Sequence, residues 1–413
     1  METHIAPVFV APEAVRIPNE YLVVFKDQTS QEEVEAVVST VSLAGGINQM
    51  LYHYSVLSGF AARLDDAALD KIRRTRSVQY VEENQRIWLQ ASFLSPADGI
   101  DRTDQRVGHD GLYDDHGRDG TGVHVYVLDT GLNTQHSEFI GRVRGGYTAV
   151  ADGHGVEDCN GHGSHVSSTV VGTVYGMAKK ATLHPVRVLD CTGGGTWAAV
   201  LAGVDFVHGD CARHQGPCVA NMSLGGASNS ALNQAVANAV NAGVTFVVAA
   251  GNEDVDACTR SPAGVSKAIT VASIDDNDSR AGFSNWGGCV DLFAPGVTIQ
   301  GAWWGGSKAT QTLSGTSMAS PHVAGVAAQY LGVYPHATPA QVEAGILSSA
   351  SIHCVADPKG SPNKLLFSDL DQGNYYCGSS CQGRCGGPSD GCFCDPGCGI
   401  YGDCCTDFTE VCE

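Results

Sequence analysis

The chain has 413 residues, which is long enough for two or three domains with at least one large core. It contains 51 glycines and 16% charged residues, a composition that indicates a turn-rich globular protein rather than a disordered or coiled-coil one. The formal net charge of -20 argues against nucleic acid as a partner, because phosphate binding needs a basic face, and no apolar run is long enough to span a bilayer.

Sixteen cysteines indicate disulfide chemistry and therefore an oxidising compartment. The leader segment, residues 1–19, lacks both the basic region and the sustained apolar region of a signal peptide. We give the cysteines more weight and expect a secreted, extracellular protein whose signal peptide is not evident in this sequence.

Residues 20–90 alternate strand and helix patterns. The strand patterns lie at 20–25, 53–64 and 78–84, and the helix patterns at 30–41 and 65–75. Their order fits a small ferredoxin-like α+β module of the β-α-β-β-α-β type. The module contains no cysteine and no cluster of catalytic side chains.

Residues 91–370 are expected to form a larger α/β domain. Strand patterns lie at 122–129, 182–190, 218–224 and 244–251, with helix patterns at 198–211 and 230–243. These strands are too apolar to face water on one side, which predicts a mostly parallel central sheet flanked by helices. Ligand sites in such sheets lie beyond the carboxyl ends of the strands, so we expect the functional residues there.

Four polar residues occupy such junctions. Asp129 and Asn252 follow predicted strands, and His162 and Ser317 stand where a loop leads into a helix. Together they are the parts required for acyl transfer: a serine nucleophile, an imidazole that accepts its proton, a carboxylate that orients the imidazole, and an amide that donates to the oxyanion.

Each member also has a purely structural explanation. Asp129 and Asn252 are typical turn residues, and Ser317, in the segment GTSMASPHVAGVAA (315–328), could simply cap the following helix. Fifteen histidines make any one of them a weak candidate. Only the joint pattern therefore favours catalysis.

The surroundings of the four residues resemble the signature segments of subtilisin-like serine proteases (peptidase S8 family), particularly the proteinase K branch. The segments are YVLDTGLN, NGHGSHV, AAGNE and GTSMASPHVAG, in that order, with Ser164 where the family usually has Thr. The resemblance implies a subtilisin-like fold and a serine endopeptidase that works through an acyl-enzyme without a catalytic cofactor. It assigns Asp129, His162 and Ser317 to the triad and Asn252 to the oxyanion hole.

The resemblance also implies that an extended protein or peptide substrate lies between residues 192–197 and 222–226. The implied substrate-binding residues are Gly193, Gly194, Trp197, Ser223, Leu224, Gly225, Ala249, Ala250 and Gly251. The last three would line the primary pocket with small groups, which predicts aromatic or large aliphatic side chains before the scissile bond and no fixed charge that demands Lys or Arg. Trp197 could equally be a core residue.

Residues 20–90 resemble the inhibitory prodomain (inhibitor I9 type) of this family, which acts as folding assistant and intramolecular inhibitor. Slow folding of parallel sheets gives a physical reason for such a template. The tail of the module would occupy the cleft, and we expect the zymogen to be cut near Gln90–Phe93.

Two kinds of metal site are considered. Cys159, His162 and His165 have C-x2-H-x2-H spacing, but zinc lacks an evident fourth ligand there and competes with the triad for His162. The resemblance instead implies a structural calcium ion held by the carbonyls of Ser266 and Ala268 and by the carboxylate of Asp291, although Asp291 could merely cap a loop.

A second calcium-binding stretch in some relatives resembles DRTDQ, with Asp101, Asp104 and Gln105, but the residues that follow diverge.

The cysteines before residue 380 allow full pairing. Cys159–Cys191 and Cys258–Cys289 match pairs in extracellular bacterial relatives. Cys211 and Cys218 could close a local loop, which leaves Cys354 and Cys377, though spacing alone does not determine connectivity.

Residues 377–413 hold nine cysteines and almost no apolar core, so disulfides must replace core burial. The eight from 381 to 412 resemble a somatomedin B domain, which implies a disulfide knot that binds an unspecified protein; zinc binding is the alternative.

For the whole chain, two rival functions are an inactive protease-fold binding protein and an esterase. The complete triad argues against the first, and the absence of a G-x-S-x-G elbow at Ser317 argues against the second.

Overall fold

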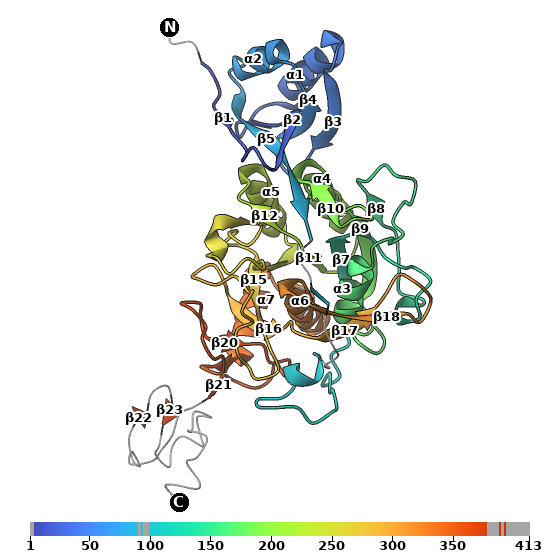
Figure 1. Ribbon diagram of the computed structural model, residues 1–413, viewed down its shortest axis with the longest axis vertical. Coiled ribbons are helices and arrows are strands. Elements are labelled where there is room, and N and C mark those ends of the chain that lie inside the picture. Colours follow the sequence, from blue (N-terminus) through green and yellow to red (C-terminus); the bar gives the residue numbers. More distant parts are fainter. Residues whose placement is uncertain (1–3, 90–91, 94–98, 378–387, 390–391, 394–413) are drawn as a thin grey trace, which may run out of the picture.

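The computed structural model describes residues 4–89, 92–93, 99–377, 388–389 and 392–393 (Figure 1). Most of the predicted somatomedin B segment and part of the predicted cleavage region therefore lie outside the described residues. In the far tail, β22 (Pro388–Ser389) pairs antiparallel with β23 (Cys392–Phe393). None of the helices in the described part of the chain is long and apolar enough to cross a membrane.

The N-terminal module is an α+β unit, as the sequence predicts. Its sheet has the order β1-β5-β2-β4-β3. The strands are β1 (Val8–Phe9), β2 (Arg16–Phe25), β3 (Gln49–Tyr54), β4 (Gly59–Arg63) and β5 (Val78–Trp88), and the helices are α1 (Gln31–Ala44) and α2 (Asp66–Arg73). Helix α1 starts where predicted because Ser30 and Glu33 form a reciprocal capping box.

One strand prediction in this module is wrong. The stretch 53–64 is two strands, β3 and β4, joined by a turn at residues 55–58. Gly59, the first residue of β4, packs against β2 with no room for a side chain: a Cβ atom would lie 2.5 Å from the carbonyl oxygen of Val23.

The larger domain is built on a ten-stranded sheet with the order β21-β19-β20-β16-β15-β13-β11-β7-β9-β8, and all pairs except β19–β20 are parallel. Its strands are β7 (His124–Asp129), β8 (Tyr147–Thr148), β9 (Thr182–Arg187), β11 (Cys218–Met222), β13 (Thr245–Ala249), β15 (Ile269–Ile274), β16 (Leu292–Pro295), β19 (Ser351–Ile352), β20 (Lys364–Leu365) and β21 (Tyr375–Tyr376). The prediction of a mostly parallel α/β sheet is confirmed.

Helices cover both faces of this sheet (Figure 1). They are α3 (His162–Val171), α4 (Trp197–Cys211), α5 (Ser230–Asn241), α6 (Thr316–Val333) and α7 (Pro339–Ser349). Alternate residues of β7 enter different cores: Tyr126 and Leu128 pack with α4 and α5, whereas Val125 and Val127 pack with α3, α6 and α7. Burial on both faces explains why the strands are so uniformly apolar.

The remaining elements are short. They are β6 (Ser92–Phe93), β10 (Gly194–Thr196), β12 (Gly226–Ala227), β14 (Arg260–Ser261), β17 (Ile299–Ala302), β18 (Thr310–Ser314) and single 3-10 turns at Asp101–Thr103, Ser137–Phe139 and Ala257–Thr259. Strands β17, β18 and β6 form a small separate sheet that ends directly before α6.

The N-terminal module sits on α4 and α5, and β5 runs from it into the larger domain, where it pairs antiparallel with β10 (Figure 1). Asp205 on α4 accepts hydrogen bonds from the N–H groups of Ser55 and Val56 and from the Ser55 hydroxyl, at 2.6–2.7 Å. Glu82 of β5 accepts from the first N–H groups of α5, an end of a helix that favours a carboxylate. The turn at 55–58 is thus a docking element as well.

Candidate active site

Asp129 and His162 form a buried pair at the carboxyl edge of the sheet. Asp129 ends β7 and His162 begins α3, and His162 Nδ1 lies 2.8 and 2.9 Å from the two carboxylate oxygens. The bond fixes a proton on Nδ1 and leaves Nε2 as the nitrogen that can accept one. Nε2 is buried and has no hydrogen-bond partner among the described residues.

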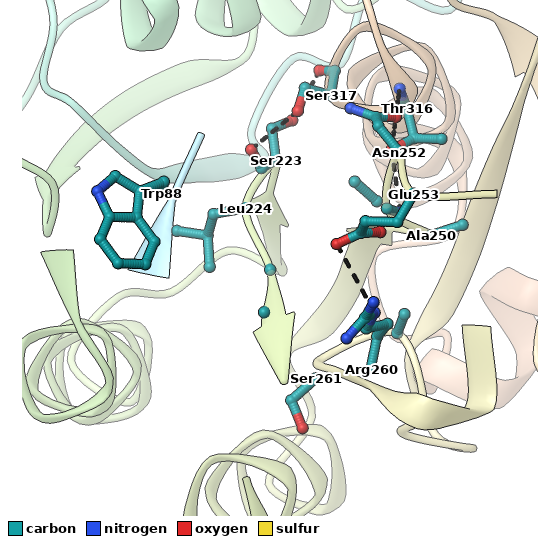
Figure 2. A pocket seen from close by; sticks show the side chains of 15 residues that line it. Trp88, Ser223, Leu224, Ala250, Asn252, Glu253, Arg260, Ser261, Thr316 and Ser317 are labelled. Atoms are coloured by element: carbon teal, nitrogen blue, oxygen red, sulfur yellow. Dashed lines mark hydrogen bonds and ion pairs between the residues drawn. The ribbon is translucent and has the colours of Figure 1, made fainter. Parts of the chain in front are cut away.

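Ser317 is the second residue of α6, so it lies inside the helix rather than at its cap. The N-cap is Gly315, which has no side chain to make a capping bond. The Ser317 hydroxyl donates to the backbone oxygen of Ser223 at 3.0 Å (Figure 2), and the Ser223 hydroxyl donates to the backbone oxygen of Ser317 at 2.8 Å. The capping explanation of Ser317 is therefore wrong.

Asn252 follows β13 and faces the start of α6 (Figure 2). Its Oδ1 accepts hydrogen bonds from the N–H and the hydroxyl of Thr316, both at 2.8 Å. Since both bonds use the oxygen, the orientation of the amide is fixed and its nitrogen, a donor, is on the other side. Asn252 and the first turn of α6 thereby lie together, as an oxyanion site requires.

A pocket opens beside Ser317 between two chain segments. Ala249, Ala250 and Gly251 form one wall, and Leu224 and Gly225 lie across from them. Gly251 has a φ of +104°, and a Cβ atom would lie 2.3 Å from Asn285 Nδ2, so both the backbone conformation and the space require glycine.

The pocket also contains an ion pair that the sequence pattern did not predict. Glu253 and Arg260 also line it, with Arg260 Nε 3.6 Å from Glu253 Oε1 and about a quarter of each side chain exposed (Figure 2). The sequence places them seven residues apart, and the 3-10 turn at Ala257–Thr259 with the Cys258–Cys289 disulfide folds Arg260 back. No local sequence pattern predicts that Arg260 lies close to Glu253.

The end of β5 lies along the predicted substrate edge. Trp88 is opposite Gly194 in the antiparallel register, and the Leu89 N–H donates to the Gly193 oxygen at 3.0 Å. The Leu89 side chain covers Gly193, where a Cβ atom would lie 3.0 Å from its Cδ1 atom. The predicted close approach of a peptide backbone thus occurs at Gly193 and Gly194, with the chain's own N-terminal module as the peptide.

Trp197 is fully buried and belongs to the same core cluster as Ile87 of the β5 tail. A Cβ atom at Gly226 would contact both side chains, at 3.0 Å from Trp197 and 3.2 Å from Ile87. Trp197 is therefore a core residue that also borders the position of a bound peptide side chain.

Comparisons with known proteins agree with this geometry. Residues 120–374, more than half of the chain, match the model of the subtilase family. The chain belongs to this family. Residues 20–90 match the peptidase inhibitor I9 family, and residues 379–413 match the somatomedin B domain.

Named relatives of this subtilase are proteinases. It is 46% identical over 379 residues to an extracellular serine proteinase of Thermus sp. (strain Rt41A), with 86% of this chain and 90% of the relative covered. It is 43% identical over 402 residues to alkaline serine exoprotease A of Vibrio alginolyticus, with 93% and 72% covered.

A crystal structure of a cold-adapted subtilisin-like serine proteinase matches with a TM-score of 0.63 and 49% identity, covering 67% of this chain and 99% of the other. The subtilase is a serine-type endopeptidase with an inhibitory prodomain.

Asp158 is a site residue that the sequence analysis missed. It is buried before α3, and its Oδ1 accepts from the Thr130 hydroxyl and the Gly161 N–H, while Oδ2 accepts from the N–H and hydroxyl of Ser164. It therefore ties the loop after Asp129 to the start of the helix that carries His162. Its position just before the predicted start of the helix at His162 is the sequence feature that indicates its role.

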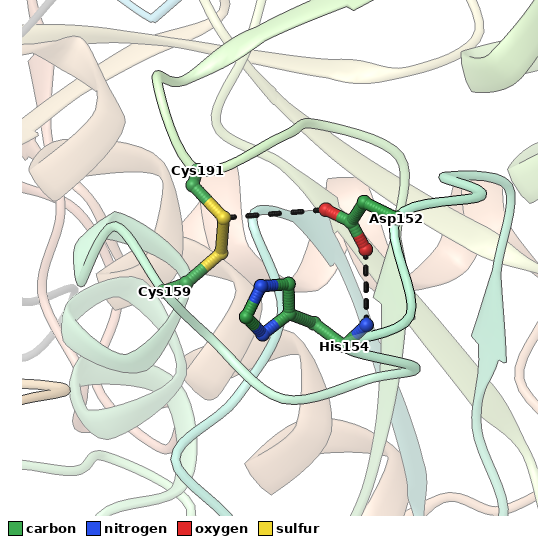
Figure 3. A group of neighbouring side chains, drawn as sticks. All are labelled: Asp152, His154, Cys159 and Cys191. Carbon is green, nitrogen blue, oxygen red and sulfur yellow. Dashed lines mark hydrogen bonds between the residues drawn. A yellow bond between two sulfur atoms is a disulfide. The ribbon is translucent and has the colours of Figure 1, made fainter.

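The zinc interpretation of Cys159, His162 and His165 is wrong for the subtilase, because Cys159 is in a disulfide and His162 is bonded to Asp129. Near Cys159, the group of Asp152, His154, Cys159 and Cys191 does not suit a metal either (Figure 3). The sulfurs are bonded to each other, and the Arg187 guanidinium already pairs with the Asp152 carboxylate.

The structure contains four disulfides in its described part: Cys159–Cys191, Cys211–Cys218, Cys258–Cys289 and Cys354–Cys377.

The residues predicted for calcium lie at the start of two neighbouring strands. Ala268 directly precedes β15, Asp291 directly precedes β16, and the Thr270 N–H donates to Asp291 Oδ2 at 2.7 Å. Burial raises the pKa of Asp291 to about 6, and the negative charge of Glu343 adds to the rise. A partly buried carboxylate is a ligand of the kind that a hard cation prefers.

In the DRTDQ stretch, the carboxylates of Asp101 and Asp104 accept backbone N–H groups of residues 110–114.

Proposed function

We propose that Asp129, His162 and Ser317 form the catalytic triad of this endopeptidase, with Asn252 in the oxyanion hole. The buried bond from His162 Nδ1 to Asp129 carries the proposal, because it prepares Nε2 to accept the Ser317 proton. For this transfer the Ser317 hydroxyl must leave its bond with the Ser223 oxygen.

In the reaction, the deprotonated hydroxyl attacks the scissile carbonyl and His162 carries the proton to the leaving amine. The Asn252 amide nitrogen and the N–H groups at the start of α6 stabilise the oxyanion. Water then hydrolyses the acyl-enzyme by the same steps, and no cofactor takes part.

A fluorophosphonate probe followed by peptide mapping tests the assignment. We expect the matured enzyme to carry the label on Ser317, Ser317→Ala to carry none, and Ser307→Ala, which changes an exposed serine, to label normally. Labelling of Ser317→Ala equal to that of the parent would refute the assignment.

We further propose that the primary pocket accepts aromatic or large aliphatic side chains. Its small and apolar walls, Ala249, Ala250 and Leu224, support a bulky residue. The Glu253–Arg260 pair adds polarity without net charge, so its two charges are balanced against each other for an apolar substrate.

The maturation cut is proposed near Gln90–Phe93, between β5 and β6. The support is that Leu89 is bound to Gly193 like a substrate and that Ser92 pairs with Ser314 beside α6. N-terminal sequencing of the active enzyme tests this; a mature N-terminus before residue 86 would contradict it.

Secretion is proposed because the described part of the chain carries four disulfides and a relative is named an extracellular proteinase. The somatomedin B domain is proposed to bind a protein ligand.

Calcium is proposed to bind the carbonyls of Ser266 and Ala268 and the Asp291 carboxylate, where it would clamp β15 to β16. We expect added calcium to raise the melting temperature of the Ser317→Ala chain and to have little effect on Asp291→Asn in the same background. Equal gains in the two proteins would place the calcium elsewhere.

A further inference from the structure

Three histidines meet at the end of the sheet that lies away from the catalytic residues. His124 is the first residue of β7, and His184 is the third residue of the neighbouring strand β9. His214 comes from the loop after α4, which the Cys211–Cys218 disulfide closes into a short ring. Three segments that are distant along the chain therefore converge, and a covalent bond holds the loop of the third.

Their ring nitrogens are close enough to share one ion. His124 Nδ1 and His184 Nε2 are 2.9 Å apart, and one nitrogen from each of the three rings lies within 4.8 Å of the others. A tetrahedral zinc ion with bonds of about 2.0–2.1 Å needs ligand nitrogens roughly 3.3 Å apart. This spacing falls between the observed distances. The His124 and His214 rings stack with their planes 14° apart, so one of them must turn to direct its lone pair at the same ion.

Asp210 provides the outer contact that metal-binding histidines usually have. Its Oδ2 lies 3.0 Å from His214 Nε2 and 4.0 Å from His184 Nδ1. The Tyr126 hydroxyl and the Arg213 guanidinium hold the carboxylate in place. His184 is 1% exposed, and its Nδ1 has no hydrogen-bond partner among the described residues, an expensive arrangement for a buried polar atom.

We propose that His124, His184 and His214 bind one divalent transition-metal ion, with zinc as the expected ion and Asp210 as the carboxylate behind the ligands. His184 would bind through Nε2, which places its proton on Nδ1, 4.0 Å from Asp210 Oδ2, where the charge of the carboxylate favours it. The other two histidines would each offer a lone pair from one ring nitrogen and keep their proton on the other.

The cluster is buried on one side and open on the other. His184 is buried and His124 is half-buried. The His214 side chain is 32% exposed, which gives an ion a path from solvent.

The position of the cluster indicates a structural role. Asp129 is at the carboxyl end of β7 and His124 is at its amino end, so the ion would not reach the substrate. It would instead clamp β7, β9 and the loop after α4, the helix that carries the prodomain contact Asp205.

The test uses the full chain with Ser317→Ala to prevent self-digestion, in buffer with excess calcium. Calorimetric titration with zinc chloride should give one site per chain that is lost in His214→Ala, a change at the exposed ligand, and in His184→Ala. His154→Ala, which alters the group in Figure 3, should retain the site. Zinc at 100 times its dissociation constant should also raise the melting temperature of the parent, since binding at that ratio stabilises the folded chain by about 2.7 kcal/mol.

Cobalt as a probe gives an independent readout, because a tetrahedral site with nitrogen ligands produces visible absorption bands. Zinc binding that is absent from the parent, or equal in the parent and in His214→Ala, would overturn the proposal and leave the three rings as a packing cluster. The comparison is valid only if His214→Ala has the melting temperature of the metal-free parent. If His214→Ala is less stable, His214→Asn is used in its place.

Discussion

Glu253 and Arg260 are the residues at which this subtilase departs most clearly from the pocket that its sequence predicts. The predicted walls are present, but the two charged side chains share the pocket with them. Their opposite charges balance, so removing either one leaves a single charge facing a bound side chain. Because the site is partly solvated, the effect of this single charge on substrate binding is modest.

Substrate preference should therefore change in opposite directions in two single variants. We expect Arg260→Gln to raise kcat/KM for lysine over phenylalanine before the scissile bond by about tenfold, equivalent to about 1.4 kcal/mol. Glu253→Gln should instead favour glutamate. Asp254→Asn, an exposed carboxylate outside the pocket, is the control. Unchanged preferences in both pocket variants, measured with matched peptide substrates, would show that the pair does not contact the substrate.

Asp129 is the second residue whose role can be isolated. The change Asp129→Asn preserves the shape of the side chain but stops it from holding the proton on His162 Nδ1. We expect kcat to fall by roughly 10⁴-fold with little change in KM. Circular dichroism of the matured variant checks that the fold is kept; a loss under tenfold would contradict a triad role.

At the level of elements, the prodomain is held by α4 as well as by the strand pairing of β5 and β10. Asp205 of α4 accepts three hydrogen bonds from the turn at residues 55–58. Hydrogen bonds to a charged acceptor typically contribute about 1.5–3 kcal/mol each, so this turn is a principal contact.

The change Asp205→Asn should accelerate activation. Loss of the charged acceptor weakens prodomain binding, and we expect activity to appear about tenfold earlier after the proenzyme is purified, corresponding to about 1.4 kcal/mol. Asp119→Asn, which removes a surface ion pair with Lys180, should activate at the parental rate. An unchanged lag in Asp205→Asn would mean that the strand pairing alone determines prodomain release.

At the level of the whole molecule, buried histidines determine the response to acid. Burial lowers the pKa of His165 to about 3 and of His322 to about 4. A histidine in the unfolded chain has a pKa of about 6.5. Between pH 4 and about pH 6.5 the unfolded chain therefore binds protons that the native chain excludes. Stability is therefore complete above pH 6.5 and falls as the pH decreases toward 4.

The expected slope approaches about 1.4 kcal/mol per pH unit for each of these histidines. Urea unfolding of the Ser317→Ala chain at pH 7.5, 5.5 and 4.5 measures it. His322→Gln should reduce the slope, whereas His53→Gln, an exposed position, should leave it unchanged. A stability that rises on acidification would reverse the sign and contradict the argument.

The sequence was sufficient for the features that depend on local pattern. The apolar strand patterns predicted the parallel sheet, because the alternation of side chains along a strand follows from backbone geometry. The ends of the predicted strands showed where Asp129 and Asn252 would lie, because the carboxyl ends of parallel strands meet at one edge of the sheet. The sequence was insufficient to predict contacts between loops that are distant along the chain. Arg260 reaches Glu253 through a folded turn, and His214 reaches His124 from across α4, so neither contact has a signature along the chain.

The pairing of β6 with β18 has a kinetic consequence. Leu89 is bound to Gly193 on one side of the proposed cut, and Ser92 is paired with Ser314 on the other. Hydrolysis between them leaves both new ends attached, so the cut alone does not open the cleft. The first free molecules must then destroy the prodomains of others, which makes activation second order: diluting the proenzyme should lengthen the lag in inverse proportion, and a trace of mature enzyme should abolish it.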